Sequence, residues 1–283
     1  MLTQDRPELA KRAVECFRTQ TYLNKALLVW DTSTEMNPAK RLNVGQFAPD
    51  IQHAFYGPQD YAIGALRNHA IQGGTSEVVC TVAVNKELTG PADIIVHFDD
   101  DDWSHPKRIA EQVALLQSSG ADVVGYNEML FWRTRGEMEF DKRFGDEGFG
   151  AVTEDEESIT IETGPLVEVG EAWLYSGPTT RQALGTSLCY WRKTWEARPF
   201  NPQLPRVGPG QKGGGEDWEF LRDRKIEAVS SLAWSGRYER IEMPRMIARI
   251  HGGNSSNGYS NLEESPNWKR VPQWDDKVRE MLG

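Results

Sequence analysis

Four consecutive aspartates, Asp99 to Asp102, are the residues of this chain with the clearest potential for chemistry. They follow the apolar segment Asp93 to Phe98, with the sequence DIIVHF, which predicts a buried strand. Adjacent carboxylates repel one another unless a cation neutralises them. Hard divalent ions such as Mg²⁺ and Mn²⁺ prefer oxygen ligands, often one or two carboxylates together with substrate phosphates. The run therefore indicates a divalent metal site, with a solvated acidic turn as the alternative.

A second pair of carboxylates, Glu216 and Asp217, follows three glycines at Gly213 to Gly215. A flexible loop that carries a carboxylate to the start of a helix suits a general base, which must reach the proton that it removes. Acidic residues in the first turn of a helix are also favourable simply because they oppose the helix dipole. Taken alone, the pattern favours this second interpretation.

Three polar residues elsewhere in the chain each allow two interpretations. His251, in the glycine-rich sequence RIHGGNSS, is either a third metal ligand or a surface residue. Asp31, at the end of an apolar run, either accepts hydrogen bonds from a nucleotide base or ribose, or caps the next turn. Arg67, in a helical stretch, either reaches a phosphate or faces solvent. Flat faces for stacking sugars or bases come from tryptophans, several of which belong to the core: Trp103, Trp132, Trp173, Trp191, Trp195 and Trp218.

The elements that must position these residues alternate between short apolar runs and amphipathic stretches. This alternation is typical of a mostly parallel sheet flanked by helices. Three elements are expected before the aspartates: a helix over Pro7 to Thr19, a strand over Lys25 to Asp31, and a helix with an inner face at Ile63, Leu66 and Ala70.

A helix and a returning strand are expected directly after the aspartates. Ser104 or His105 can cap this helix, and Pro106 suits its first turn. Gly120 stops the helix, and Ala121 to Tyr126 returns as a strand. This order places the aspartates at the carboxyl end of a strand, where open α/β sheets keep their ligands.

The length of 283 residues allows one large α/β domain with a sizeable core. The net charge of −10 resides in one segment, because residues 136–171 hold twelve Asp and Glu against two Lys and Arg, and the rest of the chain has thirty of each sign. An acidic protein usually avoids polyanionic partners, but here that argument applies only to the segment. We expect a loop or small hairpin there, either over the site or without a role.

The three cysteines, Cys16, Cys80 and Cys189, are too few and too far apart for a disulfide framework or a Cys-rich zinc site. No segment approaches the roughly 18 apolar residues that cross a bilayer. The N-terminus lacks the basic and apolar regions of a signal peptide. These features predict a cytoplasmic protein with reduced thiols.

Together, these pieces resemble the inverting glycosyltransferases of family 2, which have the A-type glycosyltransferase fold. In the first half, the similar segments are a T-x-N-R-P-like turn at Thr3 to Pro7, the strand LLVWD ending at Asp31, the helix motif IGALRN, and the D-x-D-like HFDDDDWSHP. In the second half, they are the E-D motif at Gly215 to Asp217 and the segment ARIHGGNSS, which carries a metal-reaching His in some members. The likeness spans nearly the whole chain, and the aspartate run and the G-E-D triplet are specific in combination.

The resemblance implies a metal-dependent enzyme of the hexosyltransferase type, with a nucleoside diphosphate sugar as donor, a UDP-sugar in the first place. It implies Asp217 as the catalytic base with Glu216 beside it. It also implies Mn²⁺ or Mg²⁺ on Asp100, Asp102 and His251, since counting back from Pro106 selects these two aspartates. Donor contacts are expected from Thr3, Asp5, Arg6, Asp31, Arg67, Asp100 and Asp101.

The chain departs from the family pattern in several places. Its first strand is nearly absent, Asp5 replaces the usual Asn, and residues 72–91 form a longer connection than usual. We expect one continuous domain with a Rossmann-like donor half. Its parts are residues 1–130 for nucleotide sugar and metal, residues 131–175 as an acidic insertion or lid, and residues 176–283 for the acceptor and a polar tail.

Two kinds of acceptor stay open. Bacterial members usually build surface polysaccharide, so a saccharide is one. The sequence HFDDDDWSHPKRIAEQ, followed by VGYNEMLFW, also resembles stand-alone enzymes of phage-like gene sets, for which the acceptor can be a hydroxymethylated base in DNA. A sugar nucleotidyltransferase is an alternative, although TQDRPE is not a glycine-rich phosphate loop. A non-catalytic nucleotide- or carbohydrate-binding protein is another, and it would have no need of the E-D pair.

Overall fold

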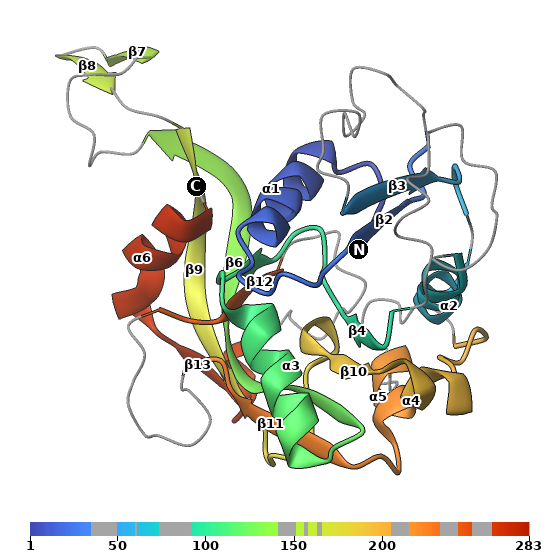
Figure 1. The fold of residues 1–283 in the computed structure, drawn as a ribbon. Coiled ribbons are helices and arrows are strands. Elements are labelled where there is room, and N and C mark those ends of the chain that lie inside the picture. Colours follow the sequence, from blue (N-terminus) through green and yellow to red (C-terminus); the bar gives the residue numbers. More distant parts are fainter. Residues whose placement is uncertain are drawn as a thin grey trace.

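The computed structural model describes residues 1–34, 50–59, 61–73, 92–140, 151–155, 158–162, 166–204, 215–232, 243–250 and 262–282. Within these residues it shows helices packed against two sheets, so the predicted α/β class is confirmed (Figure 1). None of the helices in the described ranges is long and apolar enough to cross a membrane.

The N-terminal part is a small parallel sheet covered by a helix. Its strand order is β1 (Leu2–Thr3), β2 (Leu27–Asp31) and β3 (Ile51–Phe55). Helix α1 (Pro7–Arg18) starts with a proline in its first turn, as expected, and buries Ala10, Ala13, Val14 and Phe17. These side chains form one core with the apolar residues of β2. The first strand has only two residues, which agrees with the departure noted in the sequence.

The larger sheet is mixed and is centred on one long strand. It contains β4 (Ile94–Val96), β5 (Trp103–Ser104), β6 (Val123–Phe140), β9 (Leu166–Ser176), β10 (Cys189–Trp191), β11 (Ile226–Ser230), β12 (Met246–Ile250) and β13 (Trp268–Arg270). Strand β6 pairs in parallel with β11 and β12, and antiparallel with β9 and β10. Strand β4 lies at the edge beside β10 and ends at Val96, two residues before the aspartates.

The other helices are short. They are α2 (Ile63–Gly73), α3 (Arg108–Ser119), α4 (Arg192–Ala197), α5 (Glu216–Leu221) and α6 (Asp275–Leu282), with 3₁₀ turns η4 (Gly185–Ser187), η5 (Leu262–Glu264) and η6 (Pro272–Trp274). Gly120 ends α3 with φ +62°, a left-handed conformation that favours glycine.

Of the two residues expected to cap α3, Ser104 does not do so, because it belongs to β5 and the helix begins only at Arg108, after Lys107. His105 does lie at the helix start, where its Nδ1 accepts a hydrogen bond from the backbone N–H of Lys107 at 3.1 Å. The Ser104 hydroxyl instead accepts a hydrogen bond from the Arg108 guanidinium at 2.8 Å. The residue that the sequence offered as a cap is therefore used to hold a buried arginine.

The acidic segment contains the expected hairpin, formed by β7 (Ala151–Asp155) and β8 (Ser158–Glu162). Its two ends are not loop, because β6 continues to Phe140 and β9 begins at Leu166. The hairpin lies beyond the ends of these long strands and well apart from α2 and α5 (Figure 1). A lid role for residues 131–175 stays a prediction.

Candidate active site

The aspartate run lies between β4 and β5, at the carboxyl end of β4, as predicted. Asp100 and Asp102 are buried, whereas Asp99 and Asp101 are partly exposed. Burial, and then the charges of the neighbouring aspartates, raise the pKa of Asp102 well above its ordinary value. Burial likewise raises the pKa of Asp100 to about 7, although Arg6 opposes the shift. The run therefore concentrates negative charge that is poorly solvated.

Arg6 neutralises part of the negative charge of the aspartate run. Its Nη2 lies 2.8 Å from Asp100 Oδ1, and its Nη1 donates a 2.8 Å hydrogen bond to Asp101 Oδ2. The contact with Asp100 is an ion pair and not a well-aligned hydrogen bond, since neither oxygen of Asp100 has a hydrogen bond of good geometry to the described residues. The structure thus brings two predicted donor contacts, Arg6 and Asp101, together with a predicted metal ligand.

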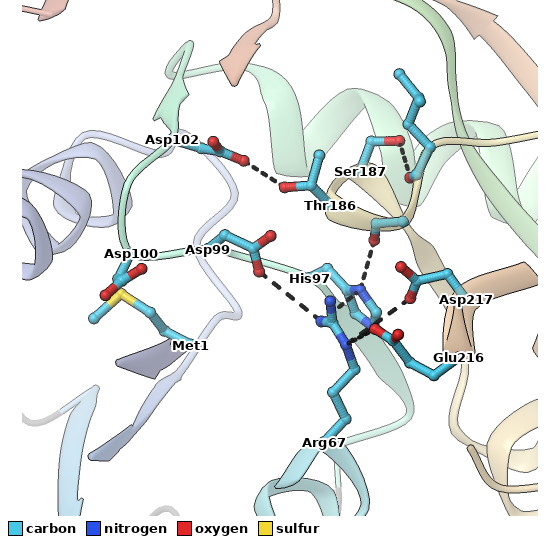
Figure 2. Close-up of polar contacts among 12 residues, drawn as sticks. Met1, Arg67, His97, Asp99, Asp100, Asp102, Thr186, Ser187, Glu216 and Asp217 are labelled. Atoms are coloured by element: carbon cyan, nitrogen blue, oxygen red, sulfur yellow. Dashed lines mark hydrogen bonds and ion pairs between the residues drawn. The ribbon is translucent and has the colours of Figure 1, made fainter. Parts of the chain in front are cut away.

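Asp102 is oriented by residues from two other segments. The Thr186 hydroxyl donates to its Oδ2, and the backbone N–H of Arg249 donates to its Oδ1 at 3.2 Å. Figure 2 shows the Asp102 side chain directed at Thr186, while Asp99 points toward Arg67. Turn η4 and strand β12 therefore fix the direction of this carboxylate.

Arg67 is the link between the aspartate run and the second carboxylate pair (Figure 2). Its Nε lies 3.4 Å from Glu216 Oε1 and 3.9 Å from Asp217 Oδ1, and its Nη1 lies 3.9 Å from an oxygen of Asp99. The arginine is buried, so it does not face solvent. Burial alone would lower the pKa of Arg67, but the three carboxylates together raise it above its ordinary value, and the side chain stays cationic.

Asp217 stands in the first turn of α5, after Gly215, as the sequence indicated. Removal from water and then the adjacent Glu216 raise the pKa of Asp217 to about 7, while Arg67 opposes the shift. Its Oδ1 has no hydrogen-bond partner among the described residues. The Asp217 side chain as a whole is 26% exposed, whereas its Oδ1 is shielded from solvent. These are the properties of a general base that works near neutral pH.

His97 was not singled out by the sequence, yet it lies directly under Arg67. Its Nδ1 is 2.7 Å from the carbonyl oxygen of Gly185, and its Nε2 is 3.2 Å from the hydroxyl of Tyr190. Two acceptors 2.7 Å apart would repel, so we assign the proton to Nδ1, which donates to Gly185. Arg67 Nη1, 3.0 Å from the same nitrogen, is then in contact with it without donating to it. Burial, and then the charge of Arg67, lower the pKa of His97 well below its ordinary value, and the ring stays neutral.

A buried arginine, Arg108, links the segment before the aspartates to the η4 turn. Arg108 Nη2 donates to the carbonyl oxygens of His97 at 2.8 Å and of Thr186 at 3.2 Å. Its Nε donates to Gln112 at 3.2 Å. Helix α3 therefore holds both the strand that carries the aspartates and the η4 turn. The signal for Arg108 in the sequence was weak, because a charged residue near a helix start is normally exposed.

The residues expected to contact the nucleoside form a neighbouring turn. Asp31 Oδ1 accepts hydrogen bonds from Ser33 N and Oγ at 2.9 and 2.6 Å, and its Oδ2 lies 2.9 Å from His53 Nε2. Burial raises the pKa of Asp31, but these hydrogen bonds outweigh that effect and the net shift is downward. Asp31 thus caps the following turn, which was one of its two interpretations.

Thr3 and Asp5 lie at the end of β1, and the chain there is hydrogen-bonded to the turn that follows β2. Asp5 adopts φ +53° and accepts hydrogen bonds from the backbone N–H of Thr34 at 2.9 Å and from its hydroxyl at 3.0 Å. Thr3 is buried, and its carbonyl oxygen accepts from Thr32 N at 3.0 Å. These hydrogen bonds hold the segments after β1 and after β2 together, beside Arg6.

Asp100 and Asp102 are the candidate donors for a divalent ion among the described residues. No group of three His, Cys, Asp or Glu side chains with metal-binding geometry is assembled within the described ranges, and His251 lies outside them. By chemistry, however, Asp100 and Asp102 fit. They are hard oxygen donors, buried, with raised pKa values, and Asp100 lacks well-aligned hydrogen bonds in this part of the chain. A cation would relieve the repulsion that burial creates.

No protein-family model matches this chain, and no curated protein matches it. Among solved structures, TarS 1–349 of S. aureus in complex with UDP-GlcNAc is similar with a TM-score of 0.52 and 12% identity, covering 93% of this chain and 61% of that one. The complex of TarS 1–349 with UDP has a TM-score of 0.50 and 11% identity, covering 88% of this chain and 59% of that one. The mannosyltransferase PcManGT from Pyrobaculum calidifontis, in complex with GDP-Man and Mn²⁺, has a TM-score of 0.46 and 12% identity, covering 83% of this chain and 56% of that one.

The chain spans 58% and 61% of the length of two of the TarS 1–349 structures. Identities near 11% establish similarity of fold and nothing finer. The chain has an α/β fold shared with the TarS structures.

Proposed function

We propose that this protein is a metal-dependent inverting glycosyltransferase, which moves a sugar from a nucleoside diphosphate sugar, a UDP-sugar in the first place, to an acceptor hydroxyl. The observation that carries the proposal is Arg67, which joins Asp99 of the aspartate run to Glu216 and Asp217 of α5. Two acidic segments more than 100 residues apart thereby form one site in a fold shared with structures that bind UDP and UDP-GlcNAc.

Asp217 is the catalytic base in this proposal. As the acceptor oxygen bonds to the anomeric carbon, the proton of the acceptor hydroxyl passes to the Asp217 carboxylate. The bond from the anomeric carbon to the diphosphate breaks on the opposite side, and the configuration inverts. A pKa of about 7 suits this role, because the group is then half ionised near neutral pH and still basic enough to take the proton. Arg67, which is itself paired with Glu216, holds the carboxylate in place.

Asp100 and Asp102, with His251, would hold a divalent cation, which neutralises charge on the departing diphosphate when bound. Thr186 and the backbone of Arg249 orient Asp102 for this task. Arg6 and Asp101 lie next to the same carboxylates and would contact the donor phosphates. Thr3, Asp5 and Asp31 would shape the nucleoside pocket through the turn that they build.

The acceptor is either a saccharide or a hydroxymethylated base in phage DNA. In this scheme residues 1–130 bind the donor and residues 176–283 the acceptor. Both acceptors offer a hydroxyl to Asp217, so the reaction is the same in chemical terms.

A thermal-shift panel tests the donor. UDP-GlcNAc, UDP-glucose and GDP-mannose are each added with and without Mn²⁺. A donor present at 100 times its Kd stabilises the folded state by about 2.7 kcal/mol and raises its melting temperature by several degrees. We expect a shift with a UDP-sugar that needs Mn²⁺. No shift with any nucleotide sugar, in either condition, would contradict the proposal.

A further inference from the structure

Arg249 is a buried arginine whose backbone and side chain contact different segments of the chain. Its backbone N–H donates to Asp102 Oδ1 at 3.2 Å, and its side chain is only 5% exposed. The guanidinium Nη1 donates to Oε2 of Glu168 on β9, and Nη2 donates to the carbonyl oxygen of Leu282 at 3.2 Å. One residue therefore connects a proposed metal ligand with β9 and with the end of α6.

Strand β12 is paired unequally on its two sides where it passes Asp102. Its antiparallel pairing with β5 covers Met246 and Ile247, whereas its parallel pairing with β6 continues to Ile250. Asp102 directly precedes β5, and its carboxylate accepts from the N–H of Arg249, beyond the last residue that β5 pairs. A strand end that is paired on one side only is less constrained, so the position of this N–H depends on what else holds Arg249.

The side chain of Arg249 is held by two partners that are themselves fixed. Glu168 is its ion-pair partner on β9. The carbonyl oxygen of Leu282 belongs to the last turn of α6, where carbonyl groups have no partner within the helix. The same oxygen also accepts from Arg12 Nη1 of α1 at 2.9 Å. Leu282 shares a core with Ile247 of β12, so α6 is packed onto the same strand.

Glu168 belongs to the acidic segment of residues 136–171, whose role the sequence left open. It lies on β9, opposite Met138 of β6, and its side chain is partly exposed. Removing one partner of an ion pair that contains a buried charge leaves that charge uncompensated, which is costly. Arg249 is therefore constrained to stay beside Glu168. One acid of the segment is in this way connected to the aspartate run through a single residue.

We propose that Arg249 is a positioning residue for Asp102: its side chain, anchored by Glu168 and by the end of α6, holds in place the backbone N–H that directs the Asp102 carboxylate toward a divalent cation. This inference rests on the proposed function, in which Asp102 is a metal ligand. Outer groups that orient a metal-binding side chain typically change metal affinity by about 10- to 100-fold when they are removed. Arg249 acts through Asp102 in this scheme and contacts no substrate.

A second ion pair of the same sheet provides the matched control. Arg270 on β13 binds Asp275, with Nη1 at 2.8 Å from Oδ1, and its Nη1 also donates to the carbonyl oxygen of Ala172 at 2.9 Å. It therefore has the same kinds of partner as Arg249, a carboxylate and a backbone carbonyl. Strands β9 and β6 lie between β13 and β12 in the sheet, so this pair is remote from Asp102.

Calorimetric titration with Mn²⁺ in the presence of UDP tests the inference on four variants, with a blank titration into UDP alone. Arg249→Met should weaken Mn²⁺ binding by about 10- to 100-fold. Glu168→Gln, which removes the anchor and keeps the arginine, should weaken it by about 10-fold. Arg270→Met and Asp275→Asn should bind the ion as the wild type does, although they also lose an ion pair. A circular-dichroism melt shows whether each variant is folded at the titration temperature.

Wild-type affinity in Glu168→Gln would overturn the inference, even if Arg249→Met does not fold. Equal weakening in all four variants would also overturn it, because the effect would then come from a general loss of stability. Binding by the wild type that is unchanged in Arg249→Met and Glu168→Gln defeats this inference alone. If the wild type itself binds no Mn²⁺, the metal site of the proposed function is wrong, and this inference fails with it.

Discussion

Gly185 and Asp217 approach each other so closely that no side chain fits between them. A Cβ atom on Gly185 would meet Asp217 Oδ2 at 1.8 Å, far inside contact distance. The carbonyl oxygen of the same glycine accepts from His97, which fixes the η4 turn. The position of the proposed base is therefore set by a glycine 32 residues away and by the histidine directly after β4.

Gly185→Ala should displace the Asp217 carboxylate and reduce kcat/KM about 100-fold, because a misplacement of about 1 Å at a reacting group can cost that much. Steady-state transfer kinetics check this, with a circular-dichroism melt to show that the variant is folded. Gly215→Ala is the matched control, since an added Cβ there has no atom within 4 Å. Similar activity in the two variants would show that the contact does not matter.

Activity should rise with pH through about 7 and then level off. Asp217 must be ionised to accept a proton, and its pKa is raised to about 7 by burial and by Glu216, against the effect of Arg67. Asp217→Asn should lower kcat by about 10² to 10⁴ and abolish this rise. The variant should not be less stable at pH 8. A carboxyl whose pKa is raised on folding destabilises the folded state when ionised, and asparagine removes that cost.

Glu216→Gln tests the origin of the raised pKa. The neutral amide removes the like charge beside Asp217, so the pKa of Asp217 should fall and the rise in kcat/KM should move to lower pH. The pH profile of kcat/KM from pH 5 to 9 is the measurement. A rise that stays at the wild-type position, or moves to higher pH, would exclude the charge of Glu216 as a cause.

Arg67→Met should destabilise the protein by about 3–5 kcal/mol, because it leaves three carboxylates without their buried cation. Urea denaturation gives the free energy of unfolding. Lys11→Met removes one partner of an exposed pair with Glu8 and should cost about 0.5 kcal/mol or less. Equal losses in the two variants would mean that Arg67 is not the electrostatic centre of the site.

Thr186→Val should weaken Mn²⁺ binding by about 10- to 100-fold, because the hydroxyl that orients Asp102 is lost. Thr186→Ser keeps a hydroxyl and should bind nearly as the wild type does. Calorimetric titration with Mn²⁺ in the presence of UDP compares the two. If the Thr186→Val and Thr186→Ser variants bind the ion equally well, the hydroxyl of residue 186 does not orient Asp102 as a metal ligand.

Much of the site's location could be predicted from the sequence, because its main signals are local. The apolar run before Asp99 predicts a strand and hence a carboxyl end, and the glycines before Glu216 predict a helix start. The contacts among these segments could not be predicted. Arg67 and Glu216 are 149 positions apart, and nothing near either residue indicates the other.

The remaining differences also have physical reasons. The acidic composition of residues 136–171 does not predict the parts of β6 and β9 that lie there. These strands form because they pair with each other across a long sequence separation, and not because of local strand propensity. The roles of His97 and Arg108 could not be predicted because polar residues near charged runs are normally solvated, whereas here both are buried and hydrogen-bonded within the protein.

Release of nucleoside diphosphate from a UDP-sugar is the measurement that tests the central claim most directly. The purified protein is incubated with UDP-GlcNAc or UDP-glucose and Mn²⁺, with and without an excess of EDTA, beside Asp217→Asn. We predict UDP release by the wild type, with water as the acceptor, that chelation abolishes and that falls at least 100-fold in the variant. Release that is equal with and without EDTA, or equal in wild type and variant, would contradict the account.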